Sequence, residues 1–120
     1  MSTLQAIDII IPVYKNAALT KICIDSILDN MREIAQFSPR IIIINDSPDD
    51  EEVNRLLKVY ADKSRDVLLL ANEKNSGFVI SVNRGLEIAI KEKRNVILIN
   101  SDTQTFKGTL SNLIDAANSD

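Results

Sequence analysis

Two carboxylates stand directly after apolar runs of this sequence, where a buried strand would end. Asp46 follows the run Arg40–Asn45, and Asp102 follows Asn95–Asn100 after one intervening residue, Ser101. An acid at the end of a strand can accept hydrogen bonds from a nucleobase or a ribose. It can also bind Mg²⁺ or Mn²⁺, because these cations often take one or two protein carboxylates and complete their shell with water and phosphate oxygens. Asp102 can equally begin a surface turn, so that acid alone does not decide the matter.

Composition excludes several other kinds of chemistry. The chain has 120 residues, enough for one compact domain, and its net charge of −3 disfavours nucleic-acid binding because no basic stripe is present. It contains no histidine, so Ser-His and Cys-His arrangements and the commonest zinc ligand are missing. The single cysteine, Cys23, rules out an internal disulfide and fits a reducing cytosol, where we expect the protein to be located. The apolar runs are too short to span a membrane.

Short runs rich in β-branched residues alternate with segments of helical periodicity. The runs predict strands at Ile7–Val13, Arg40–Asn45, Val67–Ala71 and Asn95–Asn100. Apolar residues spaced three and four apart predict helices within 19–31, 53–60, 79–90 and, more weakly, 110–117. Continuously apolar strands are typical of a parallel sheet that is buried on both faces. We therefore expect a doubly wound α/β fold, with a mostly parallel sheet and helices on both faces.

In such a sheet, ligands bind outside the carboxyl ends of the strands, where the strand order reverses. The polar residues at those ends form the shortlist for a site: Pro12 and Tyr14 to Asn16, Asn45 to Ser47, Asn72 to Asn75, and Asn100 to Thr103. Part of the second group has a structural interpretation, because Ser47 can cap a helix whose first turn holds the acids Asp49–Glu52. Asp46 precedes that cap, so we assign it a binding role.

The stretch NSGFVISVNRG contains two glycines and an asparagine at positions where a helix does not favour them, so each needs a structural or functional explanation. Gly85 lies inside a predicted helix, where it costs about 1 kcal/mol relative to alanine, and close packing against the sheet accounts for it best. Gly77 precedes the helix, where either packing or backbone contact with a ligand would explain it. Asn83 shares a helix face with Val79 and Leu86, so we expect it to be partly buried and hydrogen-bonded to a neighbouring loop.

Glycine-rich phosphate cradles are absent from the sequence. A standard dinucleotide-binding fold has G-x-G-x-x-G after its first strand, but PVYKN stands there. The pattern G-x-x-x-x-G-K is also missing. A bound nucleotide must therefore be held by other groups.

Four segments, taken in order, resemble the motifs of the family-2 glycosyltransferases, which have the Rossmann-like, nucleotide-sugar-binding GT-A fold. IDIIIPVYKN is similar to their opening strand, and IIIINDSPDD to the second strand with its terminal acids. NSGFVISVNRGLEIA is similar to the N-x-G followed by N-x-G of the third helix, and VILINSDTQT stands where the metal-binding D-x-D belongs. The forms NxGF…NRG and NSDT look most like the rhamnosyltransferase-like branch.

Carried over by position, the resemblance implies a nucleotide-binding site. Pro12 and Tyr14 would line the nucleoside pocket, and Asp46 would meet the base through the imide N–H of uracil or thymine. Gly77 and Asn83 would shape the wall of that pocket.

The same resemblance implies a cation at the end of the fourth strand. Asp102 would coordinate Mg²⁺ or Mn²⁺ on the donor diphosphate, with Asn100 and Ser101 in the first and middle positions of the D-x-D. Asp102 is then the sole full charge at the metal position, so we expect the metal dependence to be weak or absent.

The implied reaction transfers a sugar from a UDP- or dTDP-sugar to an acceptor hydroxyl with inversion, in polysaccharide or glycoconjugate synthesis. The acceptor would be a saccharide or a lipid-linked molecule, and a lipid-linked acceptor would draw the full-length enzyme to a membrane. The family's catalytic base lies downstream of the D-x-D motif, which places it beyond Asp120. We therefore expect residues 1–120 to be the donor-binding half, either truncated before the acceptor half or naturally short, and inactive alone.

Two further interpretations belong to other classes of protein. In the family's sheet order the fourth strand would present an unpaired edge at Val96–Ile99, which predicts pairing with a second copy or capping by a rearranged helix. A catalytically silent nucleotide-binding or oligomerisation module is therefore the alternative to an enzyme. A receiver-like signalling domain is disfavoured, because Pro12–Tyr14 and Asn72 stand where it needs acids.

Overall fold

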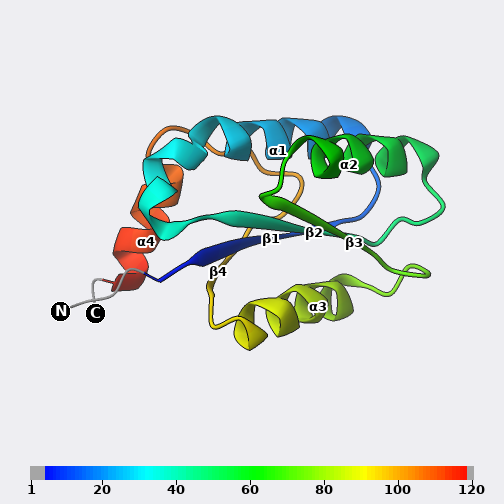
Figure 1. The fold of residues 1–120 in the computed structure, drawn as a ribbon. Helices are drawn as coiled ribbons and strands as arrows, with labels where there is room; N and C mark the ends of the chain where they lie inside the picture. The colour runs from blue at the N-terminus through cyan, green and yellow to red at the C-terminus, as the bar shows by residue number, and fades with distance from the viewer. Residues whose placement is uncertain (1–4, 119–120) are drawn as a thin grey trace.

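The computed structural model describes residues 5–118, which form a parallel four-stranded sheet between layers of helices (Figure 1). The strands are β1 (Ile7–Val13), β2 (Arg40–Asn45), β3 (Val67–Ala71) and β4 (Asn95–Leu98). The helices are α1 (Ala17–Asn30), the 3₁₀ segment η1 (Met31–Phe37), α2 (Glu51–Lys63), α3 (Phe78–Lys91) and α4 (Thr109–Asn118). The predicted α/β class is confirmed, with β4 two residues shorter than expected. Asp120, beyond which the catalytic base is expected, lies outside the described residues.

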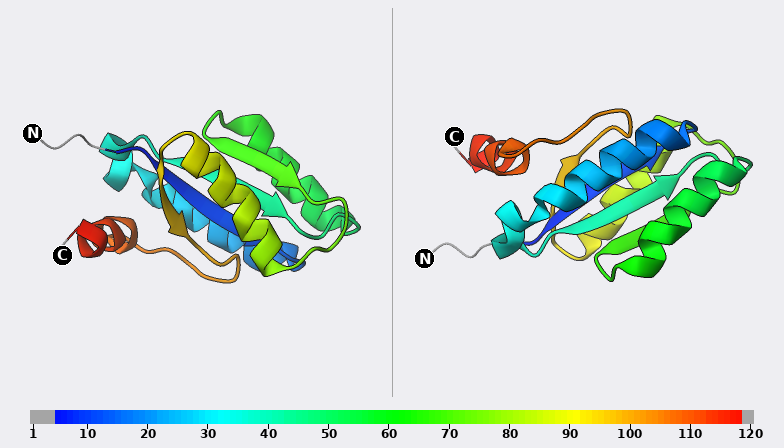
Figure 2. Two further views of the ribbon diagram at one scale, coloured as in Figure 1. Left: turned by 90° about the horizontal axis from the view of Figure 1, so that it is seen from below. Right: turned by 90° about the horizontal axis from the view of Figure 1, so that it is seen from above.

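The order of the strands is β3-β2-β1-β4, and all neighbours are parallel. Helices α1 and α2 lie on one face of the sheet and α3 lies on the other (Figures 1 and 2). The chain steps outward from β1 to β3 and then crosses back through α3 to place β4 on the far side of β1. The strand order therefore reverses at β1, while the segment after β4 runs back along the α1 face, where the Thr105 N–H donates to Oγ of Ser26. The carboxyl end of the strands at such a reversal is where a doubly wound sheet opens a crevice.

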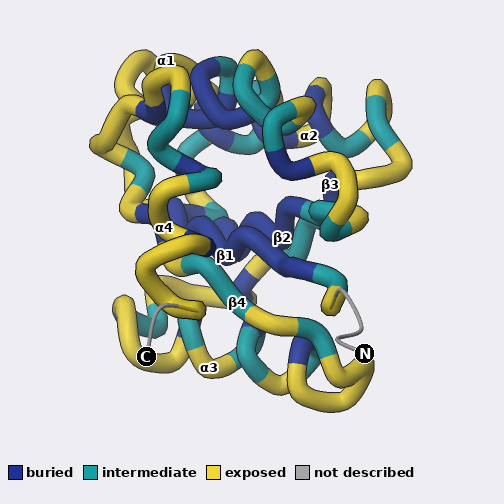
Figure 3. Tube along the Cα trace, turned by 90° about the vertical axis from the view of Figure 1, so that its left-hand side faces the viewer, coloured by how far each residue is buried: buried dark blue, intermediate teal, exposed yellow. Residues whose placement is uncertain are grey.

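The central strands β1 and β2 form the core, as the burial colours of Figure 3 show. Alternate isoleucines of each strand face opposite layers, because side chains alternate along a strand. Ile9 and Ile43 join the larger cluster beneath α1 and α2, whereas Ile10 and Ile42 join the smaller one beneath α3. This two-sided burial explains why both strands are continuously apolar.

Helix α3 lies close to the sheet through a stripe of small buried residues, Ser81, Gly85 and Ala89. A Cβ atom on Gly85 would come 2.9 Å from Cγ2 of Ile10, which confirms that this glycine serves close packing. The predicted buried face of this helix is wrong at both ends, since Val79 and Ile90 are 69% and 71% exposed.

Asn83 belongs to the same correction. It is exposed rather than partly buried, because the small-residue stripe turns its side of α3 toward solvent.

A buried ionic cluster holds the opposite end of the sheet. Asp8 is fully buried and accepts hydrogen bonds from Arg40 at 2.9 and 2.8 Å and from Nε of Arg94 at 2.6 Å. Arg94 also donates to the carbonyl oxygens of Ile7 and Ser38. Because removing one partner of a buried ion pair leaves an uncompensated charge, this cluster ties β1, β2 and the start of β4 into one register.

Helix α4 stands beside the edge strand β4, outside the two helix layers (Figure 2). Glu33 of η1 anchors its first turn by accepting hydrogen bonds from the N–H groups of Gly108, Leu110 and Ser111 at 3.0, 3.2 and 3.3 Å. An acid at this position also favours the positive end of the helix dipole. Within residues 5–118 no helix is both long and apolar enough to cross a bilayer.

The Glu33 anchor predicts a pH-dependent attachment of α4. The hydrogen bond from Gly108 N–H, followed by those from Ser111 and Leu110, lowers the pKa of Glu33 below its ordinary value despite the opposing effect of desolvation. The anchor is therefore fully present above the ordinary pKa of glutamate and is lost as the pH falls through the lowered pKa of the folded state. Amide exchange of Leu110 and Ser111, corrected for intrinsic rates, should rise in that acid range.

At neutral pH, Glu33→Gln should raise exchange at the same two amides, whereas Glu87→Gln, an exposed acid of α3, should not. Unchanged exchange in Glu33→Gln would contradict the anchor.

Candidate functional site

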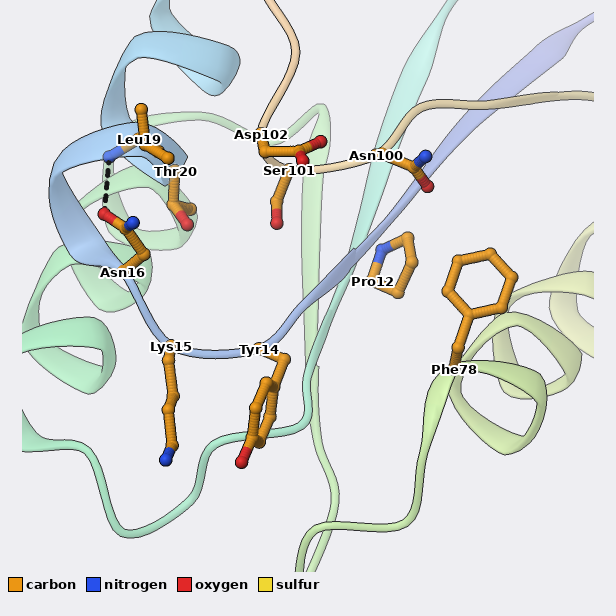
Figure 4. A pocket seen from close by; sticks show the side chains of 10 residues that line it. All are labelled: Pro12, Tyr14, Lys15, Asn16, Leu19, Thr20, Phe78, Asn100, Ser101 and Asp102. Atoms are coloured by element: carbon orange, nitrogen blue, oxygen red, sulfur yellow. Dashed lines mark hydrogen bonds between the residues drawn. The ribbon is translucent and has the colours of Figure 1, made fainter.

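A cavity of about 450 Å³ opens at the carboxyl ends of β1 and β4 (Figure 4). It is lined by Pro12, Tyr14, Lys15, Asn16, Leu19, Thr20, Phe78, Asn100, Ser101 and Asp102. The lining thus combines the end of β1, the start of α1, the first residue of α3 and the segment after β4. This is the crevice in which a doubly wound sheet binds its ligand.

The loop between β1 and α1 brings an aromatic ring and a cation to the cavity. Lys15 and Asn16 have left-handed backbones with φ of 57° and 59°, a conformation that costs about 1 kcal/mol or more for each non-glycine residue. The Lys15 N–H donates to Oγ of Ser47 at 2.5 Å, and Oδ1 of Asn16 caps α1 by accepting from the Leu19 N–H at 3.1 Å. The half-exposed Tyr14 ring lies under the Lys15 ammonium, whose Nζ is 5.1 Å from the ring centroid.

Ser47 does not cap α2, contrary to the sequence-based expectation. Asp50 is the cap, and its Oδ1 accepts from the Val53 N–H at 3.0 Å. A turn closed by the Asp50 N–H on the Ser47 carbonyl delays the helix, and the Ser47 hydroxyl is occupied by Lys15 instead.

The segment after β4 forms a turn and also faces the cavity. The carbonyl oxygen of Asn100 accepts from the Thr103 N–H at 3.2 Å and from its hydroxyl at 2.8 Å. Asp102 sits inside this turn, exposed and in the cavity lining. The turn and the ligand-facing interpretation of Asp102 are therefore compatible.

The lining carries one carboxylate, Asp102, that could serve as a cation ligand, with the amide oxygen of Asn100 and the hydroxyl of Ser101 as neutral oxygen donors nearby in the chain. No cluster of three or more His, Cys, Asp or Glu side chains suited to a metal occurs within residues 5–118. Mg²⁺ and Mn²⁺ prefer oxygen ligands and are commonly shared with substrate phosphates. These residues therefore fit a cation that is brought together with a diphosphate.

Three residues of the lining, Leu19, Thr20 and Phe78, were not on the sequence-based shortlist. Phe78, the first residue of α3, is 53% exposed, and the signal that could have found it was an aromatic directly after Gly77 at the start of a helix. Thr20 is 1% exposed, and its Oγ1 is the one buried side-chain polar atom of the described chain without a hydrogen-bond partner. In the sequence, Thr20 could have been recognised as a polar residue on the apolar face of the first predicted helix. An unpaired buried hydroxyl next to a cavity indicates that a bound molecule or water supplies its partner.

Asp46 stands apart from the cavity lining. It is 4% exposed, and its carboxylate faces the loop between β3 and α3. Burial by itself raises the pKa of this carboxyl, but hydrogen bonds from the Ser76 N–H, Asn72 and the Gly77 N–H outweigh it, so the pKa is lowered from its ordinary value.

The structure gathers five of the eight predicted site residues around the cavity: Pro12, Tyr14, Asn100, Ser101 and Asp102. Asp46, Gly77 and Asn83 are not part of the lining. The backbone conformation nevertheless explains the glycine at position 77, because its φ of +95° is one that other residues rarely adopt. Packing does not require it, since a Cβ there would meet no atom within 4 Å.

Two solved structures share this fold. A mannosyltransferase, PcManGT from Pyrobaculum calidifontis, in complex with GDP-Man and Mn²⁺, superposes with a TM-score of 0.73 at 16% identity, covering 94% of this chain and 32% of its own. TarS 1–349 of S. aureus superposes with a TM-score of 0.69 at 17% identity, covering 96% of this chain and 33% of its own. This chain spans about a third of their length. No curated protein sequence gave a match.

A family model described as glycosyl transferase family 2 matches residues 8–120, which is nearly the whole chain. The resemblance drawn from the four motifs is thereby confirmed, and so is the GT-A type of fold. The chain belongs to glycosyl transferase family 2.

Proposed function

We propose that this chain supplies the donor-binding part of an enzyme that transfers a sugar from a nucleotide diphosphosugar to an acceptor hydroxyl, with inversion. The observation that carries the proposal is the cavity at the crossover of the sheet. It places an apolar and aromatic wall, Pro12 and Tyr14, in one pocket with the carboxylate of Asp102. A nucleoside diphosphate has the same two parts, a flat base and a charged diphosphate.

The wall formed by Pro12 and Tyr14 suits the nucleoside. Both residues lie at or just after the end of β1, and the half-exposed Tyr14 ring, with the Lys15 ammonium over one face, would offer its other face for stacking (Figure 4). Stacking of a base on an aromatic ring contributes about 1–3 kcal/mol. The direct contact of Asp46 with the base that the resemblance implies stays a prediction.

The opposite side of the cavity suits the diphosphate. Asp102, with Asn100 and Ser101, would hold Mg²⁺ or Mn²⁺, which neutralises charge on a departing diphosphate. The unpaired hydroxyl of Thr20 is a donor of the lining that suits phosphate oxygens, whereas the Lys15 ammonium lies beside the Tyr14 ring. The presence of Mn²⁺ in the mannosyltransferase complex supports a divalent cation here.

Several finer points of the proposal follow the family resemblance. UDP or dTDP is the expected donor nucleotide, although the superposed mannosyltransferase binds GDP-Man. The acceptor would be a saccharide or lipid-linked molecule in polysaccharide or glycoconjugate synthesis, and the cytoplasm is the proposed location. The catalytic base would lie beyond Asp120, so residues 1–120 would not transfer sugar alone. The rhamnosyltransferase-like branch also stays a prediction.

The edge of β4 supports a second role, association with another copy. Among residues 5–118, β4 pairs with β1 alone, and a groove of about 900 Å³ separates it from α4. The N–H groups of Asn95 and Ile99 bond inward to β1, so by alternation those of Val96 and Leu98 face the groove. We propose that a second β4 pairs there, as exposed strand edges do.

The proposed donor site predicts metal-dependent nucleotide binding. Calorimetry with UDP, dTDP and GDP should show binding to the wild type that Mn²⁺ strengthens. Asp102→Ala should remove the Mn²⁺-dependent gain and weaken binding about tenfold, because contacts to a charged group contribute about 1.5–3 kcal/mol. Asp115→Ala, an exposed acid on α4, is the matched control and should bind normally. Equal Mn²⁺ dependence in Asp102→Ala would contradict the assignment of Asp102 as the metal ligand. If the wild type bound no nucleotide at all, only the alternative of an oligomerisation module would remain.

The proposed edge pairing predicts a dimer at high protein concentration in sedimentation measurements. Leu98→Lys should shift the equilibrium to monomer, since a charge on an edge strand opposes pairing. Val79→Lys replaces an apolar residue of α3 that is more exposed, 69% against 45% for Leu98, and should leave the equilibrium unchanged. A wild-type monomer at all concentrations, with fast exchange of the Val96 and Leu98 amides, would rule the pairing out.

A further inference from the structure

The hydroxyl of Thr20 is a buried polar group whose partner is missing. Thr20 is 1% exposed, and among residues 5–118 its Oγ1 is the only buried side-chain nitrogen or oxygen without a hydrogen bond. An unpaired buried hydroxyl is destabilising, so native structures pair nearly all of them. Because Thr20 lines the cavity, a molecule bound there can supply the partner.

A second donor lies one helical turn before Thr20. Asn16 is the N-cap of α1, and its Oδ1 accepts from the Leu19 N–H at 3.1 Å. With its oxygen engaged, the Asn16 amide has its NH₂ group left to donate, and that group has no partner within residues 5–118. The Thr20 N–H donates to the carbonyl oxygen of Asn16 at 3.1 Å, which holds the two residues together on the α1 side of the cavity (Figure 4).

The charge around these two donors favours an anion. The amino end of a helix carries a partial positive charge, and the 14-residue helix α1 has no acid in its first turn. The other helix ends differ: Glu51 and Glu52 occupy the first turn of α2, and Glu33 accepts from the first turn of α4. The first turn of α1 therefore offers donors and a positive field that no carboxylate of its own uses.

This end of α1 also lies beside the proposed cation ligand. Sγ of Cys23, one turn after Thr20, donates to the carbonyl oxygen of Asn100 at 3.5 Å. Asp102 follows two residues later and lines the same cavity. A diphosphate that shares a cation with Asp102 would therefore lie next to the first turn of α1.

We propose that Asn16 and Thr20 form a phosphate subsite, in which the Thr20 hydroxyl and the Asn16 NH₂ group donate to oxygens of the donor diphosphate. The inference rests on the proposed function, which supplies the diphosphate, and adds to it a contact that does not depend on the cation. It suits a cation position with a single carboxylate, because protein donors then balance part of the phosphate charge.

Calorimetry with and without the cation tests the subsite. The probe is the nucleoside diphosphate, among UDP, dTDP and GDP, that binds the wild type most tightly. Thr20→Val keeps the shape of the side chain but removes its donor, so affinity should fall about tenfold both in Mn²⁺ and in EDTA. Thr20→Ser keeps the hydroxyl and is the matched control, which should bind like the wild type.

Two further measurements separate a phosphate contact from a structural role. Thr20→Val should not weaken binding of the matching nucleoside, which carries no phosphate. Without nucleotide, Thr20→Val should unfold about 4 °C above the wild type, because it replaces an unpaired buried hydroxyl by a methyl group. Asn16→Asp keeps the capping oxygen but exchanges the NH₂ group for a second oxygen, so it should also weaken diphosphate binding in both media.

Each outcome decides the proposal. A loss in Thr20→Val that occurs with and without Mn²⁺, spares the nucleoside and is restored in Thr20→Ser supports the subsite. If the nucleoside does not bind the wild type, the affinity comes from the phosphates, and the same loss supports the subsite.

Unchanged diphosphate affinity in Thr20→Val, or an equal loss for the nucleoside, would overturn the inference and leave the proposed function intact. Binding or a loss that is seen only with Mn²⁺ would do the same, because the contact would then depend on the cation. A wild type that binds no nucleoside diphosphate would overturn both.

Discussion

The site depends on the position of β1 between two parallel strands whose connections run to opposite faces of the sheet. The order β3-β2-β1-β4 sends the chain from β1 to α1 on one face and brings it back to β4 from α3 on the other. The strand order therefore reverses at β1, and an open α/β sheet has its crevice at the carboxyl end of the strands at such a reversal. The cavity is therefore a consequence of topology, and its chemistry comes from the few residues that each loop contributes to it.

The two ends of the sheet are built differently for this reason. At the amino end, the buried Asp8 carboxylate with Arg40 and Arg94 locks the strands together. At the carboxyl end, the loops are held by hydrogen bonds between connections, as in the bond from the Lys15 N–H to Ser47, and they tolerate strained backbone. Rigid strands that carry loops joined by a few hydrogen bonds are a suitable frame for ligand-binding side chains.

The sequence allowed the strands and the ligand edge to be predicted because both rest on local signals. β-branched runs such as 41–44 mark buried strands, and polar residues after them mark the loops. The errors concern features set by tertiary contact. Apolar spacing placed Val79 on the buried face of α3, but small residues let that helix approach the sheet on another side. Similarly, Ser47 has a capping side chain, but Lys15, distant in the sequence, occupies it. Phe78 was missed because only the fold brings the start of α3 to β1.

The arrangement of base wall and cation ligand is tested most directly by a crystal structure of the protein with UDP and Mn²⁺. We expect the base to lie against Pro12 and Tyr14, and we expect an anomalous peak for manganese between the diphosphate and Asp102. A nucleotide in the groove between β4 and α4, or manganese away from Asp102, would contradict it.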